Sequence, residues 1–131
     1  MAELWLSTRL VGPLAVVLAG GEVDLGSSPD LRDHLLAVLC HLGPWLVLDL
    51  TRVTFVDSSG LAVLVDFWRR ARAAGGELFL VGPSGAVARK LEVTGLDRRL
   101  AVCPDVDSVL ESLPASCSGP HRSAGQEPGG A

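Results

Sequence analysis

Residues 45–65 read WLVLDLTRVTFVDSSGLAVLV, and this stretch decides the fold. Its first part, WLVLDL at residues 45–50, is short and nearly all apolar, which is typical of a strand covered on both faces of a sheet. Beyond Gly60 the apolar side chains recur at helical spacing and form one stripe, made of Leu61, Leu64, Val65 and Trp68. The stretch therefore predicts a buried strand, a polar junction and an amphipathic helix.

The same alternation continues in both directions along the chain. Residues 4–11 and 14–20 flank a Gly-Pro turn and predict a hairpin that feeds an inner strand. Ser28 followed by Pro29 is a start signal for a helix, and Gly43 ends it. Two further strand and helix pairs follow, at residues 77–81 with 83–95 and at residues 99–103 with 104–113. This order predicts an α/β fold with a mainly parallel sheet, an N-terminal hairpin strand and about four helices.

Composition limits the class of protein. The 131 residues fit one domain, and a hydrophobic content of 48% is enough for a core. A net charge of −4 argues against a nucleic-acid partner, so Arg69, Arg70 and Arg72 are predicted to be a solvated helix face. No apolar run is as long as a membrane helix, and the N-terminus lacks the basic start of a signal peptide. We therefore expect a cytoplasmic protein with no membrane partner.

The last part of the chain differs from the rest. Residues 114–131 are rich in Pro, Gly and Ser and have almost no large apolar side chains, so they cannot offset their own ordering entropy. We predict a domain over residues 1–113 and a disordered tail over residues 114–131. Three widely spaced cysteines suit reduced thiols, and Cys40 and Cys103 are expected to pack as small hydrophobic side chains; the third is Cys117.

The polar junction Asp57-Ser58-Ser59 raises the question of function. Asp and Ser are strong helix N-cap residues, so capping is the simplest role for this cluster. One cap needs one residue, however, and at least one hydroxyl is left free. The junction lies at the carboxyl edge of the predicted sheet, where open α/β folds usually place their functional sites.

A hydrolase nucleophile is one alternative for Ser58. The G-x-S-x-G pattern is missing, and His34, His41 and His121 are not placed to act as its base. A small enzyme that uses Ser58 or Asp57 remains the rival from a different class of protein. We do not expect the protein to be an enzyme.

Ligand-binding alternatives fit the sequence less well. The stretch GPSGAVARK, residues 82–90, has a superficial similarity to a phosphate-binding loop, but Lys90 comes five residues after Gly85 instead of directly after a glycine. A turn followed by a helix cap explains the stretch. Cys40 and His41 are adjacent and have no partner pair at metal-ligand spacing, so no metal site is predicted.

The whole pattern resembles the anti-sigma factor antagonist family, the bacterial STAS domains. The resemblance covers about Leu4 to Leu113 and is most specific in the strand followed by D-S-S-G-L, residues 57–61. Supporting motifs are GGEVDLGSSPDLRDHL at residues 20–35 and GGELFLVGPSGAVARKLEVTGL at residues 75–96.

The resemblance implies a phosphorylation switch at Ser58. The unmodified antagonist would bind an anti-sigma factor that is also a serine kinase, and so free a sigma factor. Phosphorylation would end this binding, and a PP2C-type phosphatase would reset it. The implied docking residues are Glu22, Asp24, Asp57, Ser58, Ser59 and Gly60. ATP and magnesium would belong to the kinase, so no cofactor is expected on this chain.

Several alternatives stay open within this resemblance. Asp24 could instead cap or turn the loop before the first helix, and Ser59 is a second candidate for modification. The domain could also serve as a STAS regulatory or scaffold module of another complex, stressosome-like or transporter-associated. In each case we expect an added phosphate to be tolerated by the free N–H groups and dipole of the helix N-terminus, so that the domain stays folded.

Overall fold

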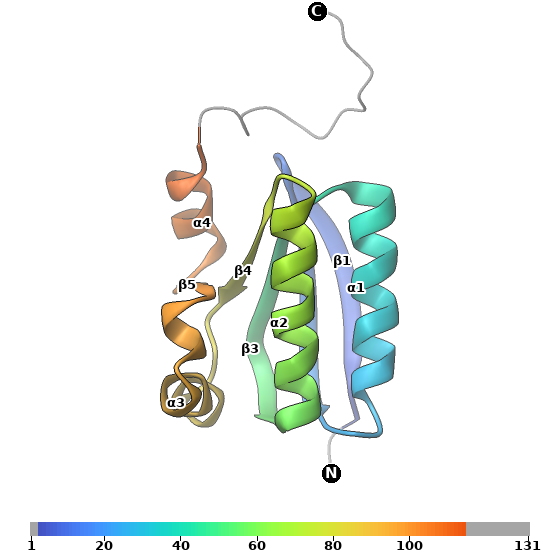
Figure 1. Cartoon of the computed structure of the whole chain (residues 1–131), viewed down its shortest axis with the longest axis vertical. Helices are drawn as coiled ribbons and strands as arrows, with labels where there is room; N and C mark the ends of the chain where they lie inside the picture. Colours follow the sequence, from blue (N-terminus) through green and yellow to red (C-terminus); the bar gives the residue numbers. More distant parts are fainter. Residues whose placement is uncertain (1–2, 115–131) are drawn as a thin grey trace, which may run out of the picture.

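Five strands form one sheet in the order β1-β2-β3-β4-β5 in the computed structural model, which describes residues 3–114 (Figure 1). Strand β1 pairs antiparallel with β2, and the other neighbours are parallel. The strands are β1 (Trp5–Val11), β2 (Leu14–Val23), β3 (Trp45–Val56), β4 (Glu77–Val81) and β5 (Ala101–Cys103). The mainly parallel sheet with an N-terminal hairpin strand is therefore confirmed.

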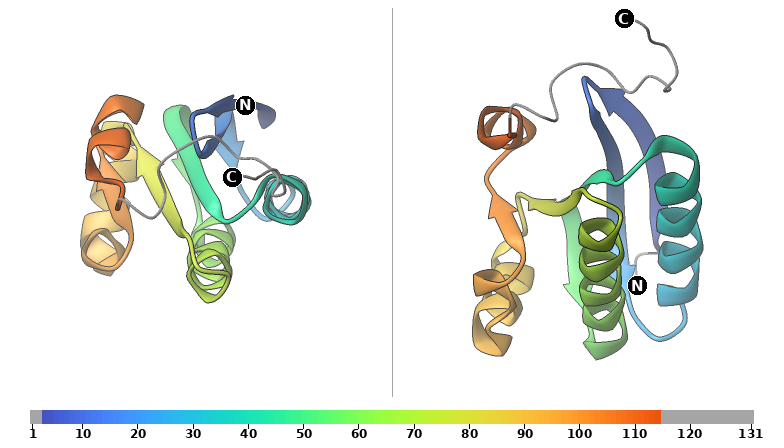
Figure 2. Two further views of the ribbon diagram at one scale, coloured as in Figure 1. Left: turned by 90° about the horizontal axis from the view of Figure 1, so that it is seen from above. Right: turned by 45° about the horizontal axis from the view of Figure 1, so that its top comes forward.

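Helices cover the two faces of this sheet unequally. The helical elements are α1 (Ser28–Leu42), α2 (Ser58–Ala73), α3 (Gly85–Thr94), the short 3-10 helix η1 (Leu96–Arg98) and α4 (Val106–Ser112). Helices α1, α2 and α3 pack on one face, and α4 packs on the other (Figure 2). Because α4 is short, most of the apolar core lies on the face of the first three helices.

The buried stripe of α2 differs from the predicted one. Leu61 and Leu64 are buried as expected, but Phe67 is fully buried and Trp68 is only partly covered. The face toward the sheet includes Phe67, while the ring of Trp68 lies at the edge, where the guanidinium of Arg72 stacks at 5.2 Å. Burying a phenylalanine side chain contributes roughly 1.5–3 kcal/mol to stability. Phe67, and not Trp68, is therefore the aromatic side chain that anchors α2 to the sheet.

Strand β3 is longer than predicted. We expected it to end at Leu50, but it continues to Val56, because its second half pairs with the second half of β2. The pairing register shifts twice on the way, between Leu18 and Gly20 and again just after Gly21. Strand β4 pairs only with residues 45–49 of β3. The ends of β2 and β3 therefore project beyond the rest of the sheet, and α2 begins at this projecting end.

Other predictions have mixed outcomes. Cys103 packs partly buried on the α4 side of the sheet, whereas Cys40 is exposed on α1, so the expectation that Cys40 packs as a hydrophobic side chain is wrong. It lies on the face of α1 that points away from the sheet. Cys117 and residues 115–131 of the predicted tail lie outside the described residues. Within residues 3–114, no helix has the length and apolar character needed to cross a membrane.

Candidate functional site

Asp57 directly follows the projecting end of β3 and caps α2. Its Oδ1 accepts hydrogen bonds from the backbone N–H of Ser59 at 2.9 Å and of Gly60 at 3.1 Å. Its own N–H donates to the Val23 carbonyl at 3.0 Å, which ties the cap to the end of β2. One carboxylate thus satisfies two of the amides that a helix start leaves unpaired.

The cap narrows one prediction made from the sequence. We expected free N–H groups at the start of α2 to receive an added anion, but Asp57 already takes two of them. The hydrogen bond from the Ser59 hydroxyl is the main reason that the pKa of Asp57 lies below its ordinary value. Desolvation acts in the opposite direction and raises this pKa. Hydrogen bonds from the backbone amides of Gly60, Ser59 and Leu25 lower it further. The helix N-terminus therefore already holds one negative charge at neutral pH.

The two serines have different surroundings. Ser59 is half-buried, and its hydroxyl donates to Asp57 Oδ1 at 2.5 Å, so it supports the cap. Ser58 is exposed, and its hydroxyl makes no hydrogen bond with another residue in the range 3–114 that the structure describes. The free hydroxyl that the sequence predicted is therefore that of Ser58, the first residue of α2.

Gly60 lets the first turn of α2 approach the sheet. A Cβ atom at this position would lie 2.7 Å from Val23 Cγ1 and 2.8 Å from Val56 Cγ1, closer than carbon atoms pack. Gly60 is itself buried. The glycine of the D-S-S-G motif thus fixes how closely the start of α2 sits on the ends of β2 and β3. Because Gly60 is buried, it affects the surface around Ser58 only by setting the position of the helix.

Glu22 lies at the end of β2, and Asp24 lies in the loop that follows. Asp24 Oδ1 accepts from the N–H groups of Gly26 and Ser27, both at 3.0 Å, and from the Ser27 hydroxyl at 3.2 Å. The same hydroxyl donates to the Glu22 carbonyl at 2.9 Å. Asp24 therefore orders the loop into α1, the structural role considered for it. The loop also adjoins the cap, because the amide of Leu25 acts on the capping carboxylate.

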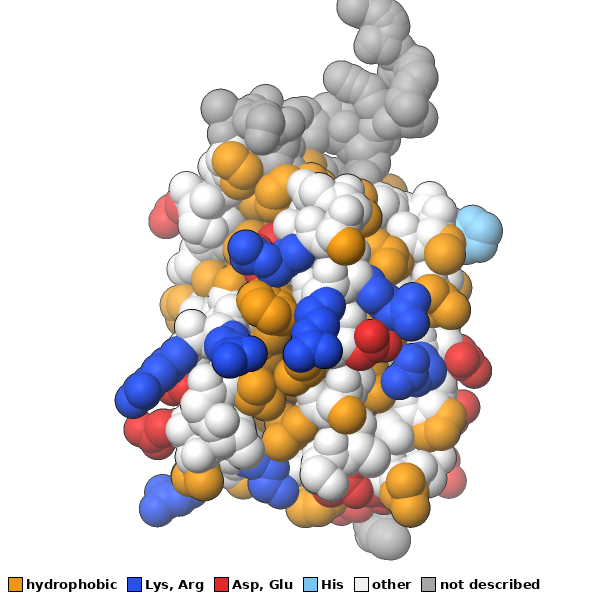
Figure 3. Space-filling model, in the orientation of Figure 1, with side chains coloured by type: hydrophobic (Ala, Val, Ile, Leu, Met, Phe, Trp, Pro, Cys, Tyr) orange, Lys and Arg blue, Asp and Glu red, His pale blue; other side chains and the backbone are white. Residues whose placement is uncertain are grey.

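A groove of about 400 Å³ opens beside Ser58, between the start of α2 and helix α3. Its lining residues are Ser58, Leu61, Ala86, Arg89, Lys90, Val93 and Thr94. Among these lining residues two are basic and none is acidic. Figure 3 shows Lys and Arg side chains over α3 and along α2, on the same face of the molecule.

Lys90 ties α3 to the projecting end of β3. Its Nζ donates to the Val56 carbonyl at 2.8 Å and lies 4.9 Å from the centre of the Phe55 ring. Phe55 is 42% exposed, and the neighbouring elements add Leu25, 77% exposed, and Val93, 78% exposed. We call Leu25, Phe55 and Val93 the apolar rim. Exposed apolar side chains beside charged ones are typical of a surface that binds another protein.

Sequence reasoning missed the role of α3 in this site. Lys90 was considered only as part of a phosphate-binding loop, and Arg89 was not considered at all. In the structure, residues 82–84 lead irregularly into α3, and the hydroxyl of the N-cap residue Ser84 donates to the Val53 carbonyl at 3.0 Å and not to a helix amide. No local signal in the sequence relates Lys90 to Ser58, because only the packing of α3 against β3 brings them to one groove.

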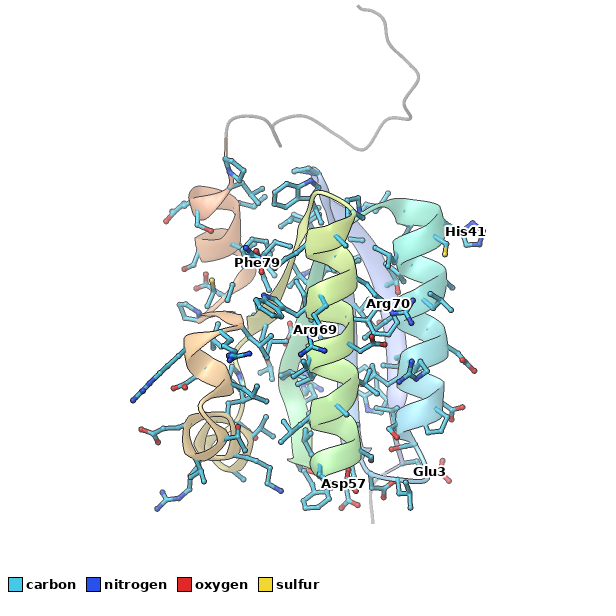
Figure 4. The ribbon with its side chains drawn as sticks, viewed as in Figure 1. Glu3, His41, Asp57, Arg69, Arg70 and Phe79 are labelled. Carbon is cyan, nitrogen blue, oxygen red and sulfur yellow. The ribbon has the colours of Figure 1, made fainter. Side chains whose placement is uncertain are left out.

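The residues considered for catalysis lie elsewhere. His34 Nε2 is 2.6 Å from the Thr8 hydroxyl on β1. His41 is in the last turn of α1, at the opposite end of the molecule from Asp57 (Figure 4). His121 is outside the described residues. Within residues 3–114, no group of three or more His, Cys, Asp or Glu side chains is placed to hold a metal ion.

Fold and site together define a class: a small α/β domain that presents an accessible serine at the start of the helix after its central strand. The model of the STAS domain family matches residues 7–109, and the chain belongs to this family.

Its relatives include anti-sigma factor antagonists. The anti-sigma-B factor antagonist of Listeria monocytogenes is 35% identical over 80 residues, which are 61% of this chain and 70% of the relative. The corresponding protein of Bacillus subtilis is 37% identical over 76 residues, 58% of this chain and 69% of the relative. The crystal structure of an anti-sigma factor antagonist from Mycobacterium paratuberculosis is 28% identical with a TM-score of 0.77, covering 84% of this chain and 93% of that one.

Proposed function

We propose that this protein is an anti-sigma factor antagonist whose binding is switched by phosphorylation of Ser58. The unmodified chain binds an anti-sigma factor that is also a serine kinase, and a sigma factor is released. The phosphorylated chain dissociates, and a PP2C-type phosphatase restores it. One observation carries the proposal: at the first residue of α2, the Ser58 hydroxyl is exposed and has no hydrogen-bond partner among residues 3–114, next to an apolar rim suited to a protein partner.

The phosphoryl transfer needs little from this chain. The Ser58 oxygen attacks the γ-phosphorus of ATP held by the kinase, the bond to the bridging oxygen of ADP breaks, and the hydroxyl proton passes to a base of the kinase. This chain supplies a nucleophile on a rigid helix start. Asp57 and Ser59 hold the first turn of α2, so the hydroxyl is presented in a fixed position.

The docking surface combines the residues around this hydroxyl. It consists of Glu22, Asp24, Asp57, Ser58 and Ser59, with Gly60 acting through the backbone position, together with the apolar rim. The half-buried acids give this surface negative charge close to apolar side chains. A kinase domain that recognises it needs a complementary basic and apolar surface.

Phosphorylation weakens such a complex by electrostatics and bulk. The phosphate adds a charge of about −1.5 to −2, next to a carboxylate that is already ionised. In the complex this charge must be desolvated against the partner. A hundredfold loss of affinity takes only about 2.7 kcal/mol, which a buried charge at an interface readily supplies.

Two substitutions at Ser58 test the proposal. With a candidate anti-sigma factor kinase, Ser58→Asp should raise the Kd by about a hundredfold while the circular dichroism spectrum stays unchanged. Ser58→Ala should bind as tightly as the wild type and take up no phosphate from ATP, as measured by mass spectrometry. The matched control is Ser7→Asp, which makes the same change at an exposed serine of β1 and should leave the Kd within about threefold.

Two outcomes would count against this mechanism. If an active kinase adds phosphate to the Ser58→Ala variant, the modified residue is not Ser58, and Ser59 is the first position to examine. Equal affinities of the Ser58→Asp and Ser7→Asp variants would show that charge at the start of α2 does not control binding.

A further inference from the structure

A phosphate on Ser58 has little to bind on its own helix. Asp57 already accepts hydrogen bonds from the amides of Ser59 and Gly60, so these donors are not available to it. The same carboxylate is ionised and lies one residue away, so it repels a second anion. Apart from the amide of Ser58 itself, the groups that hold the phosphate have to come from another element.

Helix α3 provides cations on the opposite side of the groove. Lys90 is the only lysine of the chain, and its Nζ is already placed at the end of β3 by the Val56 carbonyl. An ammonium group has three donors, and this bond uses one of them. Arg89, which is exposed, forms no ion pair with any residue in the described range 3–114. Both side chains line the groove that Ser58 borders.

Resting on the proposed function, we propose that Lys90 and Arg89 form a binding site for the phosphate dianion carried by Ser58. The phosphate projects into the groove, and the Lys90 ammonium group moves toward it from its place over the Phe55 ring. Arg89 adds a second cation at the same groove. The pair replaces the helix amides that Asp57 occupies, and it links the start of α2 to α3 in the phosphorylated state only.

Pairing of Lys90 with the phosphate also changes the apolar rim. In the unmodified chain, Lys90 lies over the Phe55 ring. When the ammonium group moves toward the phosphate, the cation no longer covers the ring in the same way, and the surface that a partner meets changes at two points at once. Phosphorylation would then alter the docking surface beyond the modified residue.

The test uses phosphoserine placed at position 58 during translation, so that no kinase is needed. Phosphorus NMR then gives the second pKa of the phosphate. In Lys90→Gln we expect the proton affinity of the phosphate to rise roughly threefold, because a neighbouring cation that favours the dianion is gone. Arg89→Gln should act in the same direction with a smaller effect, and Lys90→Arg should retain the wild-type value.

Arg69→Gln is the matched control for this measurement. It removes one positive charge from α2 itself, but it lies eleven residues along the helix from Ser58, roughly 16 Å away at about 1.5 Å per residue. This exceeds the screening length of about 8 Å at physiological salt. The phosphate of this variant should therefore titrate as in the parent. If Lys90→Gln and Arg89→Gln titrate like Arg69→Gln, the proposal is wrong.

A second measurement observes Lys90 directly. Protein labelled with 15N-lysine has one Nζ resonance, which we expect to shift when Ser58 is replaced by phosphoserine and to titrate with the phosphate. An unchanged resonance would overturn the proposal. An equal, saturable shift of the unmodified chain with inorganic phosphate would assign the groove to a free anion instead. Failure of a kinase to modify Ser58 would reject the proposed function and leave these results unaffected.

Discussion

Two helices of this domain begin in the same way and are used differently. Helices α2 and α4 each follow a parallel strand, and each is capped by an aspartate, Asp57 and Asp105. In both cases a serine on the first turn lowers the pKa of the capping carboxyl, through the Ser59 hydroxyl at α2 and mainly the Ser108 amide at α4. Capping alone therefore needs only an aspartate and the backbone amides of the first turn.

The first helical residue separates the two sites. At α4 this residue is Val106, which packs partly buried against the apolar core on its side of the sheet. At α2 it is Ser58, which is exposed and has no bonding partner in the described part of the chain. The second serine of the D-S-S-G motif thus belongs to the cap, while the first makes no contribution to it within residues 3–114.

The electrostatic surroundings also differ. The pocket of about 320 Å³ beside the start of α4 is lined by three carboxylates and one arginine, from Asp49, Asp105, Asp107 and Arg9. The groove beside the start of α2 is lined by Arg89 and Lys90. An anion added at α4 would meet negative charge, whereas an anion added at α2 meets one carboxylate on one side and two cations on the other. The surroundings of the start of α2 therefore suit an added phosphate better than those of the start of α4.

The largest effect on stability is expected at the third helical residue. This residue is Gly60 in α2 and Ser108 in α4. Gly60→Val should lower the free energy of unfolding by about 3 kcal/mol, because the added side chain meets Val23 and Val56 at less than contact distance. Ser108→Ala should cost less than about 1 kcal/mol, since its backbone amide still reaches Asp105. Urea unfolding measures both, and equal losses would contradict the close approach at Gly60.

The two caps should differ in strength. The Asp57 side chain accepts hydrogen bonds from two backbone amides and one hydroxyl. The Asp105 side chain accepts one hydrogen bond from a backbone amide, at 2.8 Å. Asp57→Ala should therefore lower Tm by several degrees, and Asp105→Ala by less. A thermal scan of the two variants at neutral pH checks this order. A larger loss at Asp105 would mean that the short helix α4, and not α2, depends most on its cap.

Much of the fold could be predicted because its signals are local. The Gly-Pro turn at residues 12–13, the Ser28 start signal and the stripe containing Leu61 and Leu64 each depend on neighbours in sequence. The length of β3 could not be predicted, because residues 51–56 pair with β2 across shifts of register that no periodicity reveals. Trp68 was misplaced for a related reason: the helix face that meets the sheet is set by packing.

The candidate site could be predicted in part. Capping by the junction, a free hydroxyl and the loop role of Asp24 follow from short-range chemistry. The number of amides available at the start of α2 was overestimated, because the carboxylate that caps the helix uses two of them. Arg89 and Lys90 come from a helix some thirty residues further along the chain, and only tertiary packing places them beside Ser58.

The charge of the cap gives a smaller, pH-dependent effect. The pKa of Asp57 is lowered in the folded protein, so its ionised form contributes stability above the unfolded pKa of about 3.9, and this contribution is lost as pH falls through the folded pKa. Asp57→Asn keeps an acceptor but no charge. The Tm difference between wild type and this variant should be constant from pH 7 to 5 and shrink below about pH 4. A difference that does not shrink at all as the pH falls below about 4 would show that charge is not its cause.

The smallest effect is expected at Ser58 itself, and this makes it the sharpest test of the comparison. Ser58→Ala removes an exposed hydroxyl with no partner in residues 3–114, so the free energy of unfolding should stay within about 0.5 kcal/mol of the wild type. Ser59→Ala removes the hydrogen bond to Asp57 and should cost about 1 kcal/mol. Chemical unfolding of the two variants separates a residue kept for the fold from one kept for a partner. If Ser58→Ala is the more damaging change, Ser58 is a structural residue and its place in the motif needs no switch.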